Sequence, residues 1–266
     1  MVEHALSKQV IKTVLLDIDP LARKLFSNVL EANTGIDPSN ACNLDLEQSI
    51  HFFKQVWGNC LHWGNQRFNY VEESVREVSL FLKEFSESEI HNFEVFSEKL
   101  YGWTATKPIT SIETEPVVRT TELLQKFRSV RFKTAALIMR FLCLDSSFFI
   151  VDNKKLIPPL DRVNYKMCQQ IFGKIDTDGL GKMDASFSKE KTMEFDKLGR
   201  KILGDDKVLI DNLWFIGHFY HDGSNCKIRE GVKIVDFQYL KNVNPPKKCP
   251  FSGHGCSRDK CSACTK

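Results

Sequence analysis

The stretch that decides the fold runs over residues 127–142 and reads Phe127-Arg128-Ser129-Val130-Arg131-Phe132-Lys133-Thr134-Ala135-Ala136-Leu137-Ile138-Met139-Arg140-Phe141-Leu142. Its first part is a short cationic connection, and from Lys133 onward apolar residues dominate, as in a packed helix. Residues 121–127 have the spacing of a short helix. The stretch therefore predicts two helices joined by a tight turn, with Lys133 at the start of the second.

A second segment, Ile157-Pro158-Pro159-Leu160-Asp161, also fixes a helix start. A helix does not run through a double proline, and an aspartate soon after it is a typical N-cap. We therefore expect a helix over residues 161–172, with Gly173 as its stop. A lysine and a carboxylate, each at a helix start, suit a reaction that needs an amine nucleophile and a charge that stabilises a cation.

The rest of the chain predicts mostly helix. Apolar residues recur at helical spacing over residues 5–33, 44–57, 70–85, 194–202 and 208–220. We expect a break at Asp19-Pro20, a helix start at Ser86 with Glu89 in capping-box spacing, and some β-like character over 148–151.

The expected fold class is all-α, with two lobes and a short tail. We assign residues 1–70 and 174–241 to a terminal helical lobe and residues 71–173, which include both helix starts described above, to a central lobe. Residues 242–266 form a cysteine-rich tail.

Composition excludes few classes of protein. The chain has 266 residues, of which 42% are hydrophobic and 27% charged, as in an ordinary globular protein. The net charge of +3 is compatible with a local basic face but does not by itself indicate one. Since neither a long apolar run nor a basic leader followed by an apolar run is present, we expect no membrane partner and no secretion. The expected location is the cytoplasm, in association with the nucleoid, or the nucleus in a eukaryote.

Three segments together resemble a known family. They are Lys133-Thr134 ahead of an apolar helix, Ile157 to Val163, and Ile210-Asp211-Asn212-Leu213-Trp214-Phe215-Ile216-Gly217. In order and spacing they resemble the helix-hairpin-helix DNA glycosylase superfamily, most closely its archaeal 8-oxoguanine DNA glycosylase (N-glycosylase/DNA lyase) branch. The resemblance covers about residues 120–225.

The resemblance implies roles for individual residues. Lys133 would be the Schiff-base lysine and Asp161 the catalytic aspartate. Trp214 would be an aromatic wall of the base pocket, with Asp211 as a polar neighbour. Three features depart from the branch or the superfamily. Leu137 stands where the branch has a second pocket aromatic, and the hairpin turn contains no glycine. The archaeal branch also lacks a C-terminal cysteine cluster. Because a leucine does not stack as a ring does, the excised base stays open.

The expected chemistry follows from these groups. A base inside a duplex has to be extruded and held between flat or apolar side chains. Cleavage of the bond to the sugar leaves positive charge, which a carboxylate stabilises, and a neutral amine can then form a Schiff base that permits strand cleavage. The turn supplies DNA-binding candidates in Lys126, Arg128, Ser129 and Arg131, whose cations and backbone N–H groups suit phosphates.

Four cysteines crowd the end of the chain. Cys249, Cys256, Cys261 and Cys264 have the spacing C-x6-C-x4-C-x2-C, which suits tetrahedral metal ligation. Several superfamily members carry a structural [4Fe–4S] cluster whose ligands begin with C-x6-C, so we slightly favour that cluster over zinc. A reduced tail without metal or two disulfides is the alternative. The five other cysteines are most simply buried thiols.

The sequence thus predicts a monomeric DNA glycosylase with AP lyase activity that excises a damaged or modified base, such as an oxidised purine. Two alternatives stay open. One is an N-glycosidase that acts on RNA or on a nucleoside or nucleotide. The other is a nucleic-acid-binding protein without enzymatic activity.

Overall fold

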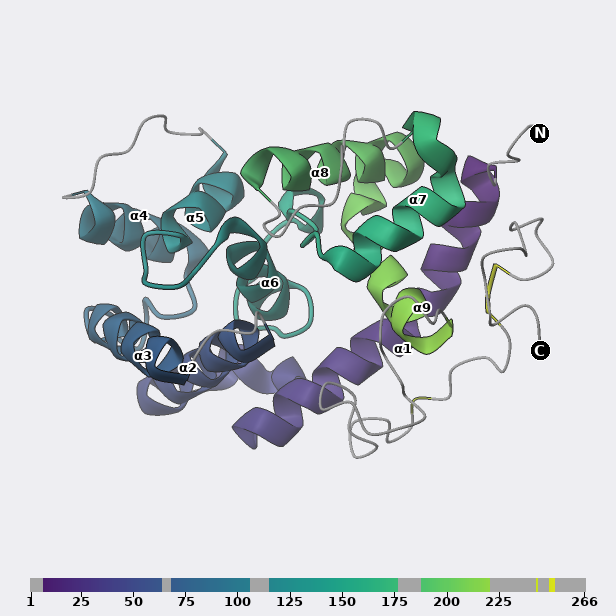
Figure 1. Ribbon diagram of the computed structural model, residues 1–266. Coiled ribbons are helices and arrows are strands. Elements are labelled where there is room, and N and C mark those ends of the chain that lie inside the picture. The colour runs from purple at the N-terminus through teal and green to yellow at the C-terminus, as the bar shows by residue number, and fades with distance from the viewer. Residues whose placement is uncertain are drawn as a thin grey trace. The chain divides into compact units, whose positions relative to one another are not determined.

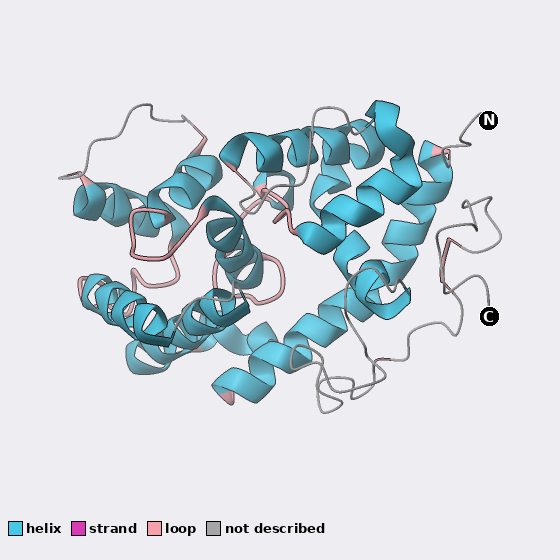
Figure 2. Ribbon diagram, in the orientation of Figure 1, coloured by secondary structure: helices cyan, strands magenta, loops and turns pink. Residues whose placement is uncertain are grey.

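All the secondary structure in the described residues is helical (Figures 1 and 2). The computed structural model describes residues 7–63, 68–105, 115–176, 188–220, 243 and 249–251. No strand occurs within these ranges, which confirms the expected all-α class. The β-like segment 148–151 is a loop instead, because Phe148 and Phe149 turn inward and are at most 1% exposed.

The chain forms two compact units, which we call unit 1 (residues 1–25 and 158–266) and unit 2 (residues 26–157). These boundaries differ from the lobe boundaries predicted at residues 70 and 173. Helix pairing explains the difference: α2 packs against α3 and α6 inside unit 2, whereas α7 packs against α9 inside unit 1.

Unit 2 is built around aromatic side chains. Its elements are the end of α1 (Lys8–Thr34), η1 (Pro38–Asn43), α2 (Leu46–Trp63), α3 (Phe68–Leu82), α4 (Phe93–Thr104), α5 (Pro116–Leu124), α6 (Phe132–Cys143) and η2 (Asn153–Lys155). The rings of Phe53, Phe96 and Phe149 contact one another at the centre, with Phe53 and Phe96 centroids 5.5 Å apart. Burial of such rings is the main stabilising contribution in a helical unit of this size.

Unit 1 contains the start of α1, α7 (Arg162–Asp176), α8 (Lys189–Leu203), η4 (Gly204–Asp211) and α9 (Asn212–Tyr220). Glycines allow its close helix contacts. A Cβ placed on Gly199 of α8 would lie 2.7 Å from the carbonyl oxygen of Lys207 in η4. A Cβ on Gly217 of α9 would lie 2.3 Å from Cγ1 of Val163 in α7. Both contacts therefore require a residue without a side chain.

Three sequence expectations about helix ends are wrong. Pro20 lies inside the continuous α1, because the helix is held on both sides of the proline by the buried Ile18 and Ala22. Gly173 lies within α7 and does not end it. The predicted helix over 208–220 is two elements, since residues up to Asp211 belong to the 3-10 helix η4.

The Ser86–Glu89 pair forms its capping contact but does not start a helix. The backbone N–H of Ser86 donates to Oε2 of Glu89 at 2.9 Å within a turn. Helix α4 begins at Phe93, where Oδ1 of Asn92 caps the N–H groups of Glu94 and Val95. Ser86 donates its backbone N–H to Glu89, and this bond is the largest cause that lowers the pKa of Glu89 to about 2.

The α7–α9 contact should not accept a methyl group. We expect Gly217→Ala to lower the free energy of unfolding by about 1–3 kcal/mol, because the Cβ overlaps Val163. The control is Gly102→Ala in α4, where no atom lies within 4 Å of the added Cβ. This control should stabilise by up to about 1 kcal/mol through helix propensity. Urea unfolding followed by circular dichroism measures both, and equal stability of the two variants would contradict the close approach.

Candidate functional site

In unit 1, Asp161 caps helix α7. Its Oδ1 accepts the backbone N–H groups of Val163 at 2.8 Å and Asn164 at 2.9 Å, which confirms the predicted N-cap. The five residues before it, 156–160, are all buried, so the double proline fixes the chain as it enters the helix. Asp161 itself is partly exposed. The carboxylate is therefore held in one orientation at a helix start whose dipole favours negative charge.

Asn164 connects this cap to Asp211. Its amide Nδ2 donates to the carbonyl oxygen of Pro159 at 3.0 Å and to Oδ1 of Asp211 at 2.5 Å. Both side chains are nearly inaccessible, with 1% of Asn164 and 4% of Asp211 exposed. One side chain thus ties the Pro-Pro segment, the first turn of α7 and the end of η4 together. Asn164 was not among the residues predicted from sequence, and its only signal was its position directly after the segment Ile157 to Val163.

A second amide anchors the neighbouring residue. Nδ2 of Asn212 donates to Oδ1 of Asp19 at 3.0 Å and to the carbonyl oxygen of Leu15 at 3.3 Å. Asp19 also accepts Nε of Arg23 at 2.6 Å. The start of α9 is therefore held to α1, while the residue before it is held to α7. Sequence reasoning missed this contact, which joins positions almost two hundred residues apart.

Trp214 stands out in α9. The neighbouring Leu213, Phe215 and Ile216 are fully buried, whereas Trp214 is partly exposed. Unit 1 therefore contains three of the residues predicted for the site, since Asp161 and Asp211 are linked through Asn164 and Trp214 follows Asp211 by one helical turn.

In unit 2, helix α6 has one accessible stripe. Ten of its twelve residues are buried, and the other two are Lys133 and Leu137. Residues four positions apart lie on the same face of a helix. The two positions to which the resemblance gives roles are therefore the two that α6 leaves accessible.

The charge of Lys133 acts on a buried thiol. Burial raises the pKa of Cys60 well above its usual value, the charge of Asp145 raises it further, and Lys133 lowers it. Beyond the end of α6, Asp145 pairs with Nε of Arg140 at 2.9 Å, and both side chains are at most 1% exposed. The Arg140 guanidinium also lies 4.7 Å from the ring centroid of Phe26. This buried pair anchors the helix that carries Lys133.

Three of the five non-tail cysteines are confirmed as buried thiols. They are Cys60 and Cys143 in unit 2 and Cys168 in unit 1, and burial raises the pKa of each. Cys42 is partly exposed, and Cys226 lies outside the described residues.

The hairpin turn joins α5 to α6 and contains no glycine. A serine adopts the left-handed backbone conformation in it. Ser129 has φ of +65°, and it is the one non-glycine residue with positive φ among those the structure describes. The turn is closed by the N–H of Val130, which donates to the carbonyl of Phe127 at 3.3 Å. The residue before α6, Arg131, is exposed and provides no side-chain cap.

Arg128 of this turn is engaged with helix α3. Its Nη1 lies 2.5 Å from Oε2 of Glu73, and its backbone N–H donates to Oε2 of Glu77 at 2.9 Å. The guanidinium also lies 5.4 Å from the ring centroid of Tyr70. Lys126 and Ser129 are partly exposed. Glu73 and Glu77 thus bind the guanidinium and backbone N–H of Arg128, which the sequence analysis predicted to bind phosphate.

The predicted metal site falls mostly outside the described residues. Of its four cysteines, Cys256, Cys261 and Cys264 lie there, and Cys249 is a buried thiol with 1% of its surface exposed. In the part of the chain that is described, no group of three or more His, Cys, Asp or Glu side chains could hold a metal ion.

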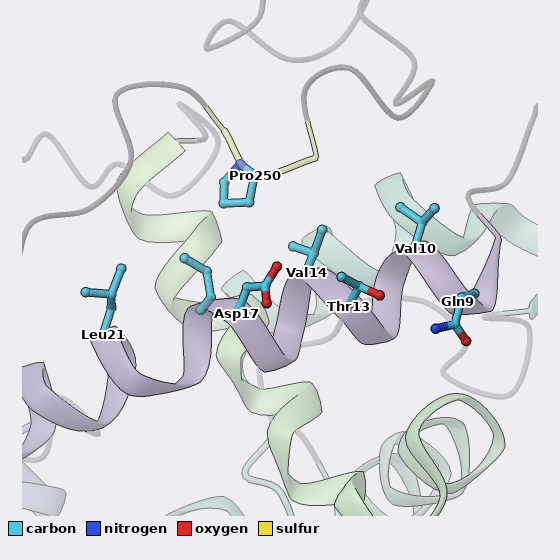
Figure 3. A pocket seen from close by; sticks show the side chains of 8 residues that line it. Gln9, Val10, Thr13, Val14, Asp17, Leu21 and Pro250 are labelled. Atoms are coloured by element: carbon cyan, nitrogen blue, oxygen red, sulfur yellow. The ribbon is translucent and has the colours of Figure 1, made fainter.

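A hollow of about 370 Å³ lies elsewhere on unit 1, between α1 and Pro250 (Figure 3). Figure 3 shows the ring of Pro250 over the face of α1 that carries Val14 and Asp17. The complete lining is Gln9, Val10, Thr13, Val14, Asp17, Ile18, Leu21 and Pro250. None of these is a predicted site residue, so the hollow does not identify the site.

No protein-family model, curated protein or solved structure matches the chain. In the described ranges, no helix combines the length and apolar character needed to cross a membrane.

The Asn164 contact should stabilise unit 1. Asn164→Ala removes hydrogen bonds to buried Pro159 and Asp211 and leaves a cavity, so we expect the free energy of unfolding to fall by about 2–4 kcal/mol. Asn153→Ala in the exposed η2 is the control and should change it by less than about 0.5 kcal/mol. Chemical denaturation compares them. A loss in the Asn164 variant no greater than in the control would show that the amide does not hold this segment.

Proposed function

We propose that the chain is a DNA glycosylase with a two-lobed helix-hairpin-helix fold, which excises a damaged or modified base and then cleaves the strand. The observation that carries the proposal is the exposure pattern of α6, where Lys133 and Leu137 alone escape burial. The side chain of Lys133 is partly exposed on a helix whose other residues, apart from Leu137, are buried. This is the placement that an amine nucleophile requires.

Lys133 would supply the nucleophile. Its neutral Nζ attacks C1′ of the sugar, the bond from C1′ to the base breaks, and the departing base carries the electron pair and takes up a proton. Opening of the sugar ring, with proton transfer to the ring oxygen, then gives a Schiff base between Nζ and C1′. Loss of a proton from C2′ expels the 3′ phosphate, which cleaves the strand.

Asp161 would stabilise the positive charge that develops on the sugar. The two N–H groups that bind its Oδ1 hold the carboxylate in a fixed orientation. The carboxylate thus lies at a helix start, where the positive end of the α7 dipole meets its negative charge.

The base would be held by flat and apolar side chains after extrusion. Trp214 offers a partly exposed ring on an otherwise buried segment, and Leu137 offers an accessible apolar side chain on α6. Asp211, held by Asn164, is the polar neighbour that the resemblance assigns to the pocket. Lys126, Arg128, Ser129 and Arg131 would contact phosphates.

The tail would have a structural role. Its four cysteines suit a [4Fe–4S] cluster slightly better than zinc, and the burial of Cys249 supports a ligand set fixed to folded protein at one end. A metal bound there would order a segment too short to fold alone.

A second candidate is an N-glycosidase that acts on RNA or on a nucleoside or nucleotide. The contacts of Glu73 and Glu77 with Arg128 favour it, because these carboxylates would oppose a duplex backbone at the turn. The same lysine and aspartate would serve there.

Covalent trapping tests the nucleophile. We expect borohydride to reduce a Schiff base between the protein and DNA that carries an oxidised purine or an abasic site, and Lys133→Ala to lose the adduct. Lys83→Ala, which changes an exposed lysine of the same unit, should retain it. An adduct that survives in Lys133→Ala would exclude this residue as the nucleophile. Base release without any adduct would exclude the lyase step.

A substitution that preserves the cap tests Asp161. Asparagine caps helices as well as aspartate does, so Asp161→Asn should fold with unchanged stability while base release falls on the order of a hundredfold or more. Asp152→Asn is the matched control, since Asp152 caps the N–H of Lys154 in η2. Single-turnover base release measures both. Equal rates in the two variants would leave Asp161 as a cap alone.

A further inference from the structure

The turn between α5 and α6 makes three contacts with one face of α3. Tyr70, Glu73 and Glu77 recur at helical spacing, and each contacts Arg128. Glu73 pairs with the guanidinium and Glu77 accepts the backbone N–H, so two carboxylates bind the same residue at two points. The turn therefore binds anionic oxygen in this structure.

The donors that bind these two carboxylates are donors that a phosphate also accepts. A phosphodiester carries two anionic oxygens, and guanidinium and backbone N–H groups are its common donors in proteins. Ser129, which follows Arg128, has the left-handed backbone that helps N–H groups of a turn converge on an anion.

The ion pair is open to competition. The side chains of Arg128 and Glu73 are 56% and 48% exposed, and ion pairs between exposed groups contribute little to stability. A ligand with the same charge can therefore displace the carboxylates without unfolding α3. Water and salt reach the pair for the same reason.

We propose that Glu73 and Glu77 are built-in competitors of a phosphodiester at the hairpin turn. They hold Arg128 when nucleic acid is absent, and a backbone phosphate displaces them on binding. This inference rests on the proposed function and adds a regulation of its DNA-binding surface. Its consequence is weak attachment to undamaged DNA, because each phosphate contact at the turn first breaks contacts within the protein.

The experiment compares two double variants of the full chain that change the charge equally. Glu73→Gln with Glu77→Gln removes the competitors. Glu72→Gln with Glu94→Gln is the control, in which both positions are exposed. Fluorescence anisotropy measures the Kd for a labelled duplex oligonucleotide that carries an abasic-site analogue, at fixed salt, and circular dichroism checks the fold of each variant.

We expect the Glu73/Glu77 variant to bind about three- to tenfold more tightly than the control variant. Adding Arg128→Ala to it should remove most of this gain, since the guanidinium that Glu73 binds is lost while the backbone N–H that Glu77 binds remains. A gain no larger than that of the control, or a gain that persists in full without the Arg128 side chain, overturns the inference while leaving the glycosylase proposal intact. Failure of the wild-type chain and of every variant to bind the duplex overturns both.

Discussion

The amide of Asn164 is the contact on which unit 1 depends. Three features that are separate in the sequence meet at this one residue: the double-proline entry, the Asp161 cap and the end of η4. Since Asn164 and Asp211 are both buried, the Nδ2 group of the amide needs protein acceptors, and each of its two donor bonds selects a chain position. The amide therefore adds a directional contact to the close apolar approach of Gly217 to Val163.

Two local features of the candidate site were predicted well from sequence. The helix predicted to start at Lys133 begins at Phe132, and Asp161 is an N-cap, because both depend on residues within one turn. The helix break predicted at Pro20 was wrong. A proline removes a backbone hydrogen bond and so disfavours a helix, but the burial of α1 on both sides of Pro20 outweighs this cost. The boundary between η4 and α9 has no apolar signature, because apolar positions continue across it.

The candidate site was predictable only as separate parts. Pattern and resemblance indicated Lys133, Asp161 and Trp214, and the structure adds that each is accessible on a largely buried element. Neither could indicate that Arg128 binds Glu73 and Glu77, because the partners lie about fifty residues away and only folding brings them together. A count of cations therefore overestimates how many are available to a phosphate.

The buried thiols allow the local opening of each unit to be measured separately. Cys60 and Cys143 belong to unit 2 and Cys168 to unit 1, and burial keeps each in its protonated, unreactive form. A thiol of this kind reacts with a labelling reagent only after its surroundings open, so its modification rate reports the local opening equilibrium. Each unit consequently contains a native cysteine that reports its local opening. Mass spectrometry of alkylated peptides could measure this opening in each unit without an engineered probe.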